Sequence, residues 1–402
     1  MKFLHDLLEK QKPAFEKGGK LEKFYYLFEA GETFLFTPPT VTKSKGAHIK
    51  DAIDLKRMMI TVVIAMIPCL IFGIWNVGHQ HYLAIGQPEA ALMDKVWIGV
   101  MLVLPIVLVS YTAGGIVEVI FGIVRKHPIN EGFLVTGMLI PLVVPATIPL
   151  WQVALATVFA VLIAKEIFGG TGMNILNVAL TARAFLYFAY PSEISGEIWT
   201  YLGDAETVSG YSGATFLALA AKASSAEPLM GAGGLLATST AGWADGMYSA
   251  QNLFMGIIPG SIGETSTLMC LIGAVILVLT GVGSWRIIVA VFAGAYAMGA
   301  LLQLIGANEF MLMPAHYHLI IGGLAFGAVF MATDPVSAAQ TESGKWVYGI
   351  LIGVLTVIIR VLNPAYPEGI MLAVLLMNVF APYIDSLVVQ SNKKRRLQRA
   401  TV

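Results

Sequence analysis

Long apolar runs alternate with short polar stretches along most of the chain. Each run is near the length that a membrane helix needs, roughly 20 residues for a bilayer core of about 30 Å. The pattern therefore predicts an all-α polytopic membrane protein with about ten transmembrane helices, where the third and fifth runs are short or interrupted. The runs lie near 58–76, 97–122, 132–146, 152–168, 174–190, 262–282, 286–305, 317–333, 345–362 and 368–388.

A polar stretch rich in Gly, Ser, Thr and Ala separates the first five runs from the second five. The sequence of 130–144, followed by Trp151, is loosely similar to that of 263–278, followed by Trp285. An odd number of spans in each half makes the halves inverted, as in many transporters. We therefore expect two inverted five-helix repeats. The predicted divisions are an N-terminal extension with an amphipathic helix (1–57), a first repeat (58–190), an outward-facing segment (191–250), a second repeat (251–390) and a basic tail (391–402).

The composition agrees with a membrane location. The 402 residues are 57% hydrophobic and 12% charged, against roughly 25% charged residues in soluble domains. This excludes an ordinary cytosolic enzyme, and the high hydrophobicity excludes disorder. Both cysteines, Cys69 and Cys270, lie in apolar runs and make no metal or disulfide pattern. The sequence has no Walker or Rossmann motif, so nucleotide chemistry such as NADH oxidation would have to occur on another chain.

The net charge of zero hides an uneven distribution. Most bases lie in the N-terminal extension and in the C-terminal cluster, whereas acids dominate the loops on the opposite side. Cytoplasmic loops of membrane proteins are enriched in Lys and Arg, which predicts that both termini are cytoplasmic. Lys165 fits this rule as a cytoplasmic-end base, while Arg183 and Arg360 fit it less well.

The tetrapeptide Ser212-Gly213-Ala214-Thr215 lies in the outward segment. One interpretation is a turn in which Ser212 caps the following helix. The other is an acceptor hydroxyl on Thr215, which small neighbours leave accessible and beside which backbone N–H groups can hold a phosphate.

Two helix breaks fall within the predicted spans. The first runs from Gly169 through Gly172 to Asn174 and Asn177. Irregular backbone at membrane depth lines a cavity or is covered by protein, and two Asn one helical turn apart can present their amides to one ligand. Close helix packing through small residues is the alternative. The second break, 333–337, contains an Asp before Pro that either caps a helix or contacts a ligand.

Acids inside membrane segments are functional candidates. Glu118 and Asp385 lie within predicted spans, and their oxygens suit a hard cation such as Na⁺. Alternatively, both lie near enough to the cytoplasmic surface to be hydrated.

The chain resembles the family of B subunits of Na⁺-translocating NADH:quinone oxidoreductases and the related D subunits of Rnf complexes. The resemblance rests on the SGAT motif and on segments spread over the whole chain, and the N-terminal segment favours the former group. These segments include KLEKFYYLFEAGETFLFTPP (20–39), VRKHPINEGFLVT (124–136), AKEIFGGTGMNILNVAL (164–180), FMATDPVSA (330–338) and RVLNPAYPEGIML (360–372). Two positions depart from the family pattern: Ser209 replaces an acid before the motif, and Val178 replaces a Pro.

The resemblance implies cofactors and sites. A flavin transferase would join FMN to Thr215 through a phosphoester, and a non-covalent riboflavin would lie in the membrane part. Glu118 and Asp385 would take up Na⁺, with no other metal, and ubiquinone would bind near Gly114, Gly115 and Phe133.

The resemblance also implies a setting. The chain would be a multi-pass component of a six-subunit complex in a bacterial inner membrane, without nucleic-acid partners and with its basic tail on anionic lipid. The D subunit of an Rnf-type complex and a secondary transporter of inverted-repeat fold are the alternatives.

Overall fold

The computed structural model describes residues 2–16, 19–36, 55–126, 132–196, 198–203, 207, 208, 211, 213–223, 247–363, 366 and 368–400. Within these residues the chain is helical and has no strand. Five of the described helices are long and apolar enough to cross a membrane. They are α3 (Leu55–Ala84), α4 (Leu92–Arg125), α11 (Trp285–Ile305), α14 (Glu342–Leu362) and α15 (Ile370–Ala400).

The other predicted runs form shorter or interrupted helices. They contain α5 (Gly132–Leu142), α6 (Leu150–Ala160) continued by the π-helix η2 (Val161–Glu166), α7 (Val178–Ala189) and α10 (Thr267–Leu279). The run near 317–333 contains α12 (Tyr317–Ile320), α13 (Leu324–Phe326) and the π-helix η4 (Gly327–Met331). Each of the predicted runs thus contains helix, while ten complete spans, the inverted repeat and the cytoplasmic termini stay predictions.

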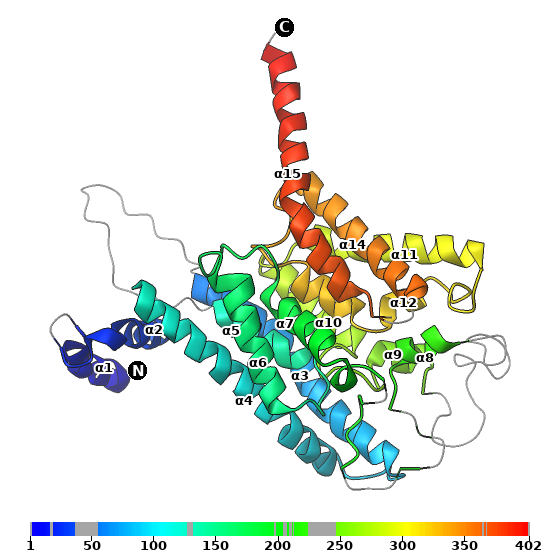
Figure 1. The fold of residues 1–402 in the computed structure, drawn as a ribbon, viewed down its shortest axis with the longest axis horizontal. Helices are drawn as coiled ribbons and strands as arrows, with labels where there is room; N and C mark the ends of the chain where they lie inside the picture. Colours follow the sequence, from blue (N-terminus) through cyan, green and yellow to red (C-terminus); the bar gives the residue numbers. More distant parts are fainter. Residues whose placement is uncertain are drawn as a thin grey trace.

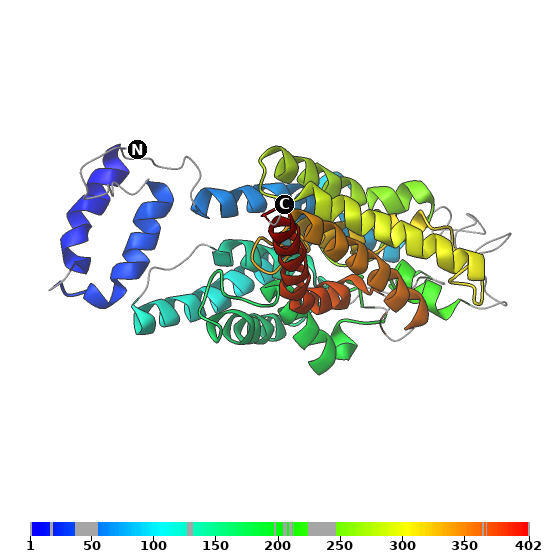
Figure 2. The same ribbon diagram turned by 90° about the horizontal axis from the view of Figure 1, so that it is seen from above.

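The long helices form two neighbouring groups: α3 packs against α4, and α14 packs against both α11 and α15 (Figures 1 and 2). Glycines allow close approach between α11 and α14. A methyl group on Gly294 would lie 2.3 Å from the carbonyl oxygen of Ile350, and one on Gly353 would lie 2.1 Å from that of Val291. Small residues at such contacts are typical of membrane helix packing.

Two irregular segments meet in the middle of the bundle. The N–H of Ile262 donates to the carbonyl of Val144 over 3.2 Å, and the N–H of Gly263 donates to that of Leu142 over 2.7 Å. These bonds satisfy backbone groups that lipid could not. They also join the segment after α5 directly to the segment before α10.

The N-terminal residues form a hairpin beside the membrane body, near the end of α4 (Figure 2). It consists of α1 (Lys2–Phe15), a short 3-10 turn η1 (Glu22–Phe24) and α2 (Tyr25–Leu35). The rings of Phe15 and Phe28 stack with centroids 4.7 Å apart, and Lys12 pairs with Glu32 over 2.8 Å. The helix expected in this region is therefore one arm of a helical hairpin.

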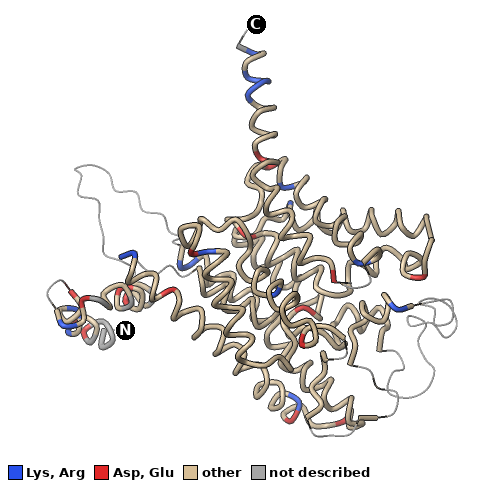
Figure 3. Tube along the Cα trace, viewed as in Figure 1, with Lys and Arg blue, Asp and Glu red and all other residues tan. Residues whose placement is uncertain are grey.

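The predicted outward segment, 191–250, is described only in part. It contains the 3-10 turn η3 (Pro191–Glu193), α8 (Phe216–Lys222) and the beginning of α9 (Ala250–Met255). At the C-terminus, α15 continues past the predicted span to Ala400. It stands out from the body of the protein, with its basic residues near the tip (Figure 3). The basic tail is thus an extension of the last helix.

Candidate functional site

The two helix breaks face each other across one cavity, which we call the break cavity. It holds about 820 Å³ of space between the atoms, part of which is open to solvent, and its wall includes residues from α3, α5, η2, both breaks and η4. Polar groups gather on part of the wall, and apolar side chains such as Met58, Leu139 and Phe330 form the rest. The polar members are Thr136, Lys165, Thr171, Asn174, Asn177, Thr333 and Asp334.

The first break is built from glycine. Gly169, Gly170 and Gly172 have φ of +121°, +96° and +88°, in the region that residues with a Cβ seldom adopt. The segment before Asn177 is therefore not helical, and the expectation that Asn174 and Asn177 lie one helical turn apart is wrong. Both nevertheless line the break cavity, whereas Gly172 does not.

The two amides are held differently. Asn177 is the N-cap of α7, because its side-chain oxygen accepts from the N–H of Leu180 over 3.1 Å. Asn174 donates to the carbonyl of Leu176 over 3.1 Å. In both residues the local backbone therefore holds one end of the side-chain amide.

The second break is stabilised by its aspartate. Asp334 accepts from the N–H of Val336 over 3.2 Å and from the hydroxyl of Ser337 over 2.7 Å. Residues 335–337 form a turn and the next helix begins only at Glu342, so Asp334 stabilises a turn and does not cap a helix. Asp334 also lines the break cavity, where contact with a ligand stays a prediction.

One observation tests whether a polar ligand fits. The hydroxyl oxygen of Thr171 is buried at the cavity wall and has no hydrogen-bond partner within the described residues. Buried polar atoms are nearly always hydrogen-bonded, so this hydroxyl indicates a missing polar partner. A flat ring with polar edges and apolar faces fits such a wall, which makes a flavin suitable.

Two neighbouring ion pairs connect α4 to η2. Lys165 pairs with Glu118, and both side chains are buried. Arg125 donates to the carboxylate of Glu166 over 3.1 Å and to its backbone carbonyl over 2.7 Å. Lys165 therefore belongs to the candidate site, although the charge rule predicts only a base at a cytoplasmic end. The signal in the sequence that could have indicated this role is the position of Lys165 inside an apolar run.

The predicted quinone residues meet on α4 and α5. A methyl group on Gly114 would lie 2.0 Å from Cζ of Phe133, whereas one on Gly115 would meet nothing within 4 Å. The ring of Phe133 also contacts that of Tyr111 edge to face at 6.2 Å. Phe133 therefore covers Gly114, and Gly115 borders open space.

Helix α5 separates this patch from the break cavity. Gly132, Val135, Thr136 and Leu139 face the cavity, while Phe133 faces α4. Packed helices lie roughly 8–10 Å apart. The two candidate sites are consequently about one helix diameter from each other.

Thr215 borders a second cavity, which we call the outer pocket. It holds about 380 Å³ of space between the atoms, part of which is open to solvent, and its wall includes Thr215, Ser261, Glu264, Gly323 and Glu368. The hydroxyl of Thr215 accepts from the N–H of Ala218 over 3.3 Å.

Thr215 is therefore the N-cap of α8, the role that we considered for Ser212. Gly213 and Ala214 are buried. Ser212 and Ser209 lie outside the described residues.

The two bases that disagreed with the charge rule are buried near the outer pocket. Arg183 pairs with Glu264 over 3.2 Å and with Glu368. Arg360 is fully buried and donates to the carbonyls of His318, Ile321 and Glu368. Protein groups thus satisfy both guanidinium ions.

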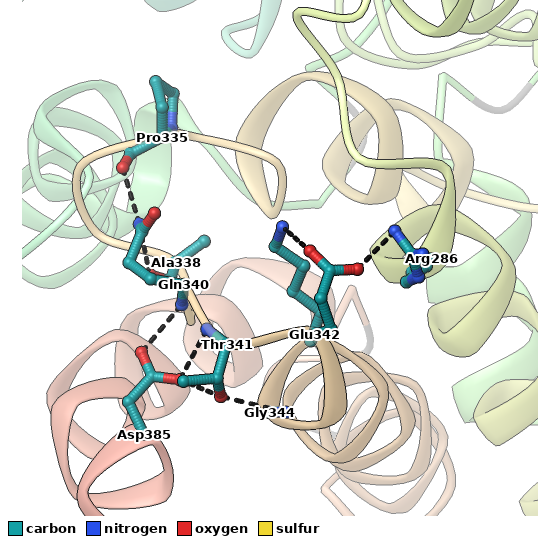
Figure 4. A network of polar contacts seen from close by, with 9 residues as sticks. Arg286, Pro335, Ala338, Gln340, Thr341, Glu342, Gly344 and Asp385 are labelled. Atoms are coloured by element: carbon teal, nitrogen blue, oxygen red, sulfur yellow. Dashed lines mark hydrogen bonds and ion pairs between the residues drawn. The ribbon is translucent and has the colours of Figure 1, made fainter. Parts of the chain in front are cut away.

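Asp385 caps a neighbouring helix (Figure 4). Its carboxylate accepts from the N–H of Gln340 over 2.7 Å, and from the N–H and hydroxyl of Thr341 over 2.9 and 2.5 Å. Thr341 is itself the N-cap of α14. The contacts of Asp385 are therefore those of a helix-capping carboxylate, and its role in Na⁺ uptake stays a prediction.

Comparison with known proteins identifies the family. The model of the NQR2, RnfD, RnfE family matches residues 42–394. The chain is 49% identical to the B subunit of the Na(+)-translocating NADH-quinone reductase of Chromohalobacter salexigens, covering 98% of this chain and 96% of the relative. The B subunits of the same name from Stutzerimonas stutzeri and Klebsiella pneumoniae are each 48% identical, covering 98% of this chain and 98% and 99% of the relatives. The chain belongs to the NQR2, RnfD, RnfE family.

Proposed function

We propose that the chain is the B subunit of a Na⁺-translocating NADH-quinone reductase. The observation that carries this proposal is the similarity to proteins of that name over 98% of the chain. The similarity to these relatives extends into the N-terminal residues that precede residue 42, where the family match begins. An Rnf-type subunit is similar only over the membrane part, so this extension favours the quinone reductase.

Thr215 is the proposed attachment site of FMN. Its hydroxyl borders the outer pocket beside small, buried neighbours, which suits a covalently held cofactor. The maturation partner is a flavin transferase that forms a phosphoester at this hydroxyl. A flavin held there supplies one-electron chemistry on the outer side of the membrane.

Riboflavin is the proposed ligand of the break cavity. Asn174, Asn177 and the unsatisfied hydroxyl of Thr171 are the groups that would hold its polar edge. The apolar remainder of the wall excludes water from the ring. Gly172 supports the turn without lining the cavity.

Ubiquinone is the proposed electron acceptor. Its proposed site lies on the side of α5 away from the break cavity, at Gly115 and beside Phe133, which covers Gly114. The thickness of one helix between the break cavity and this patch favours electron transfer between them. Glu118 and Asp385 are proposed to take up Na⁺ from the cytoplasm. The other partners are the remaining subunits of a six-subunit complex in a bacterial inner membrane and anionic lipid at the end of α15.

Flavin attachment tests the proposal. The chain is produced with its flavin transferase, denatured and examined for fluorescence on a gel and for intact mass. Thr215→Ala and Thr215→Asn are both expected to remove the covalent flavin, while Asn keeps the helix cap because it is a strong N-cap residue. Flavin that remains on Thr215→Asn would contradict the attachment site.

The same preparation separates the alternatives. A flavin-free, colourless protein would favour a secondary transporter. Co-purification with an NADH-oxidising subunit and quinone reductase activity supports the proposed complex, whereas ferredoxin-dependent reduction of NAD would indicate an Rnf-type complex.

A further inference from the structure

Asn378 joins the last helix of the chain to the first break. It lies on α15, and its side chain is buried. Its amide oxygen accepts from the backbone N–H of Asn177 over 3.0 Å. Its amide nitrogen donates to the hydroxyl of Tyr348 over 2.7 Å and to the carbonyl of Val374 over 3.1 Å. The reverse orientation would set the amide nitrogen against the N–H of Asn177, so that two donors would meet.

The other printed contacts of Asn177 are local. Its side-chain oxygen accepts from the N–H of Leu180 over 3.1 Å. Its carbonyl accepts from the N–H and the hydroxyl of Thr181 over 3.0 and 2.9 Å. These contacts lie within the first turn of α7 and move with that helix. Contact with Asn378 instead fixes this turn to a different helix.

The segment before Asn177 is poorly suited to fix it. Gly169, Gly170 and Gly172 have positive φ, and residues 173–177 are not helical. Glycine has no Cβ and leaves the backbone more freedom than other residues do. The position of Asn177 beside the break cavity therefore depends on the start of α7, which Asn378 holds.

The hydrogen bond also satisfies a buried donor. The first N–H groups of a helix have no carbonyl partner within that helix, and the N–H of Asn177 is one of them. Asn177 is 4% exposed, so little water reaches it. A buried donor that loses its partner is costly. Asn378 thus both satisfies this N–H and fixes its direction.

Tyr348 fixes the amide of Asn378 in turn. Its side chain lies on α14 and is fully buried. Because its hydroxyl accepts from the amide nitrogen, it keeps the amide from turning over and presenting a donor to Asn177. The contacts form a buried chain from α14 through α15 to α7.

We propose that Asn378 is a positioning residue for the ligand of the break cavity. It acts through Asn177, whose amide oxygen is used in the helix cap and whose amide nitrogen is the donor for a flavin carbonyl. The inference rests on the proposed flavin of that cavity. Asn378 does not itself line the cavity. Its loss therefore weakens the hold on the flavin without removing a group that touches it.

Exchange of the bound flavin tests this role. The complete purified complex is incubated with excess isotope-labelled riboflavin, and the extracted non-covalent flavin is followed by mass spectrometry. Asn378→Leu has a similar branched shape but lacks the acceptor. It is expected to release the native flavin about tenfold faster, a change that corresponds to about 1.4 kcal/mol.

Two further variants refine the test. Asn378→Asp returns an acceptor for the N–H of Asn177, and its second oxygen can accept from the hydroxyl of Tyr348. It is expected to restore most of the native retention. Tyr348→Phe leaves the acceptor in place but lets the amide turn, so we expect a smaller acceleration. This milder variant serves if Asn378→Leu fails to assemble, and a native exchange rate in Tyr348→Phe would then overturn the positioning role.

Thr356→Val is the matched control. Thr356 is a fully buried polar residue of α14, and its hydroxyl donates to the carbonyl of Ile352 within the same helix. The substitution perturbs the same bundle without touching the first break, and it is expected to keep the native exchange rate. Melting temperatures recorded for every variant separate a general loss of stability from a local loss of flavin.

The failure of the cofactor and the failure of the positioning role are distinguishable. A native complex without extractable riboflavin would refute the proposed cofactor, and the positioning role with it. Riboflavin that is present but exchanges at the native rate in Asn378→Leu would overturn the positioning role alone. Equal acceleration in Thr356→Val would do the same.

Discussion

The ring of Phe133 occupies the space over Gly114. Its Cζ lies 2.0 Å from where a β-carbon on Gly114 would stand, and the ring is 7% exposed. The neighbouring Gly115 has no atom within 4 Å of the corresponding position. Two adjacent glycines therefore have different tolerance for a side chain.

Gly114→Ala is expected to displace Phe133 and destabilise the contact between α4 and α5 by about 1–3 kcal/mol, as for other overpacked cores. If quinone binds at this patch, the KM for quinone will rise as well. Gly115→Ala is the control, expected to leave thermal stability unchanged. Equal melting temperatures for both variants would contradict the packing of Phe133 on Gly114.

Arg183→Met is expected to destabilise the protein strongly. It leaves the buried Glu264 and the half-buried Glu368 without their shared cation, and breaking a buried ion pair typically costs about 3–5 kcal/mol. Thermal inactivation of the purified complex measures the effect. Arg286→Gln removes a base from a more exposed pair with Glu342 and is expected to have little effect, so comparable losses would argue against the buried cluster.

Asp385→Ala is expected to weaken the start of α14, because three donors from Gln340 and Thr341 lose their acceptor. Loss of a helix cap typically costs about 0.5–2 kcal/mol. Thr341→Val perturbs the same cap from the other side. If capping is the main role of Asp385, both variants will change the Na⁺ dependence of turnover to a similar extent. A change confined to Asp385→Ala would instead favour direct contact with Na⁺.

The packing of α3 on α10 predicts a specific cross-link. The sulfur atoms of Cys69 and Cys270 lie 3.9 Å apart and are buried. A short, membrane-permeant reagent that bridges two thiols is therefore expected to join them within one chain, as detected by peptide mapping. Cys69→Ser provides the control, and linkage between separate chains would contradict this arrangement.

The positions of the helices could be predicted from the sequence. The partners of the charged side chains could not. Apolar runs determine helix positions through local burial, so every predicted run contains helix. The charge rule places Lys165 at a cytoplasmic end because the rule considers the position of a base and not its partners. Its contact with Glu118 depends on how η2 packs on α4, which no local pattern encodes.

The local geometry of two candidate residues differs from the expectation, although both lie at the same cavity. Asn174 and Asn177 do line one cavity, but they follow three glycines with positive φ and lie in irregular backbone where a helical turn is expected. Similarly, the cap of α8 is Thr215 and not Ser212. Such details depend on backbone torsion angles, which composition and spacing constrain weakly.

The hydrogen bonds from Ile262 and Gly263 to the segment after α5 limit how the pump can move. They connect the first five predicted spans to the second five through the backbone itself, and Arg183 adds a second connection to Glu264. Rocking one half of the chain against the other, the usual motion of inverted-repeat transporters, would break all of these contacts at once. The two halves of the chain are therefore expected to move as one body.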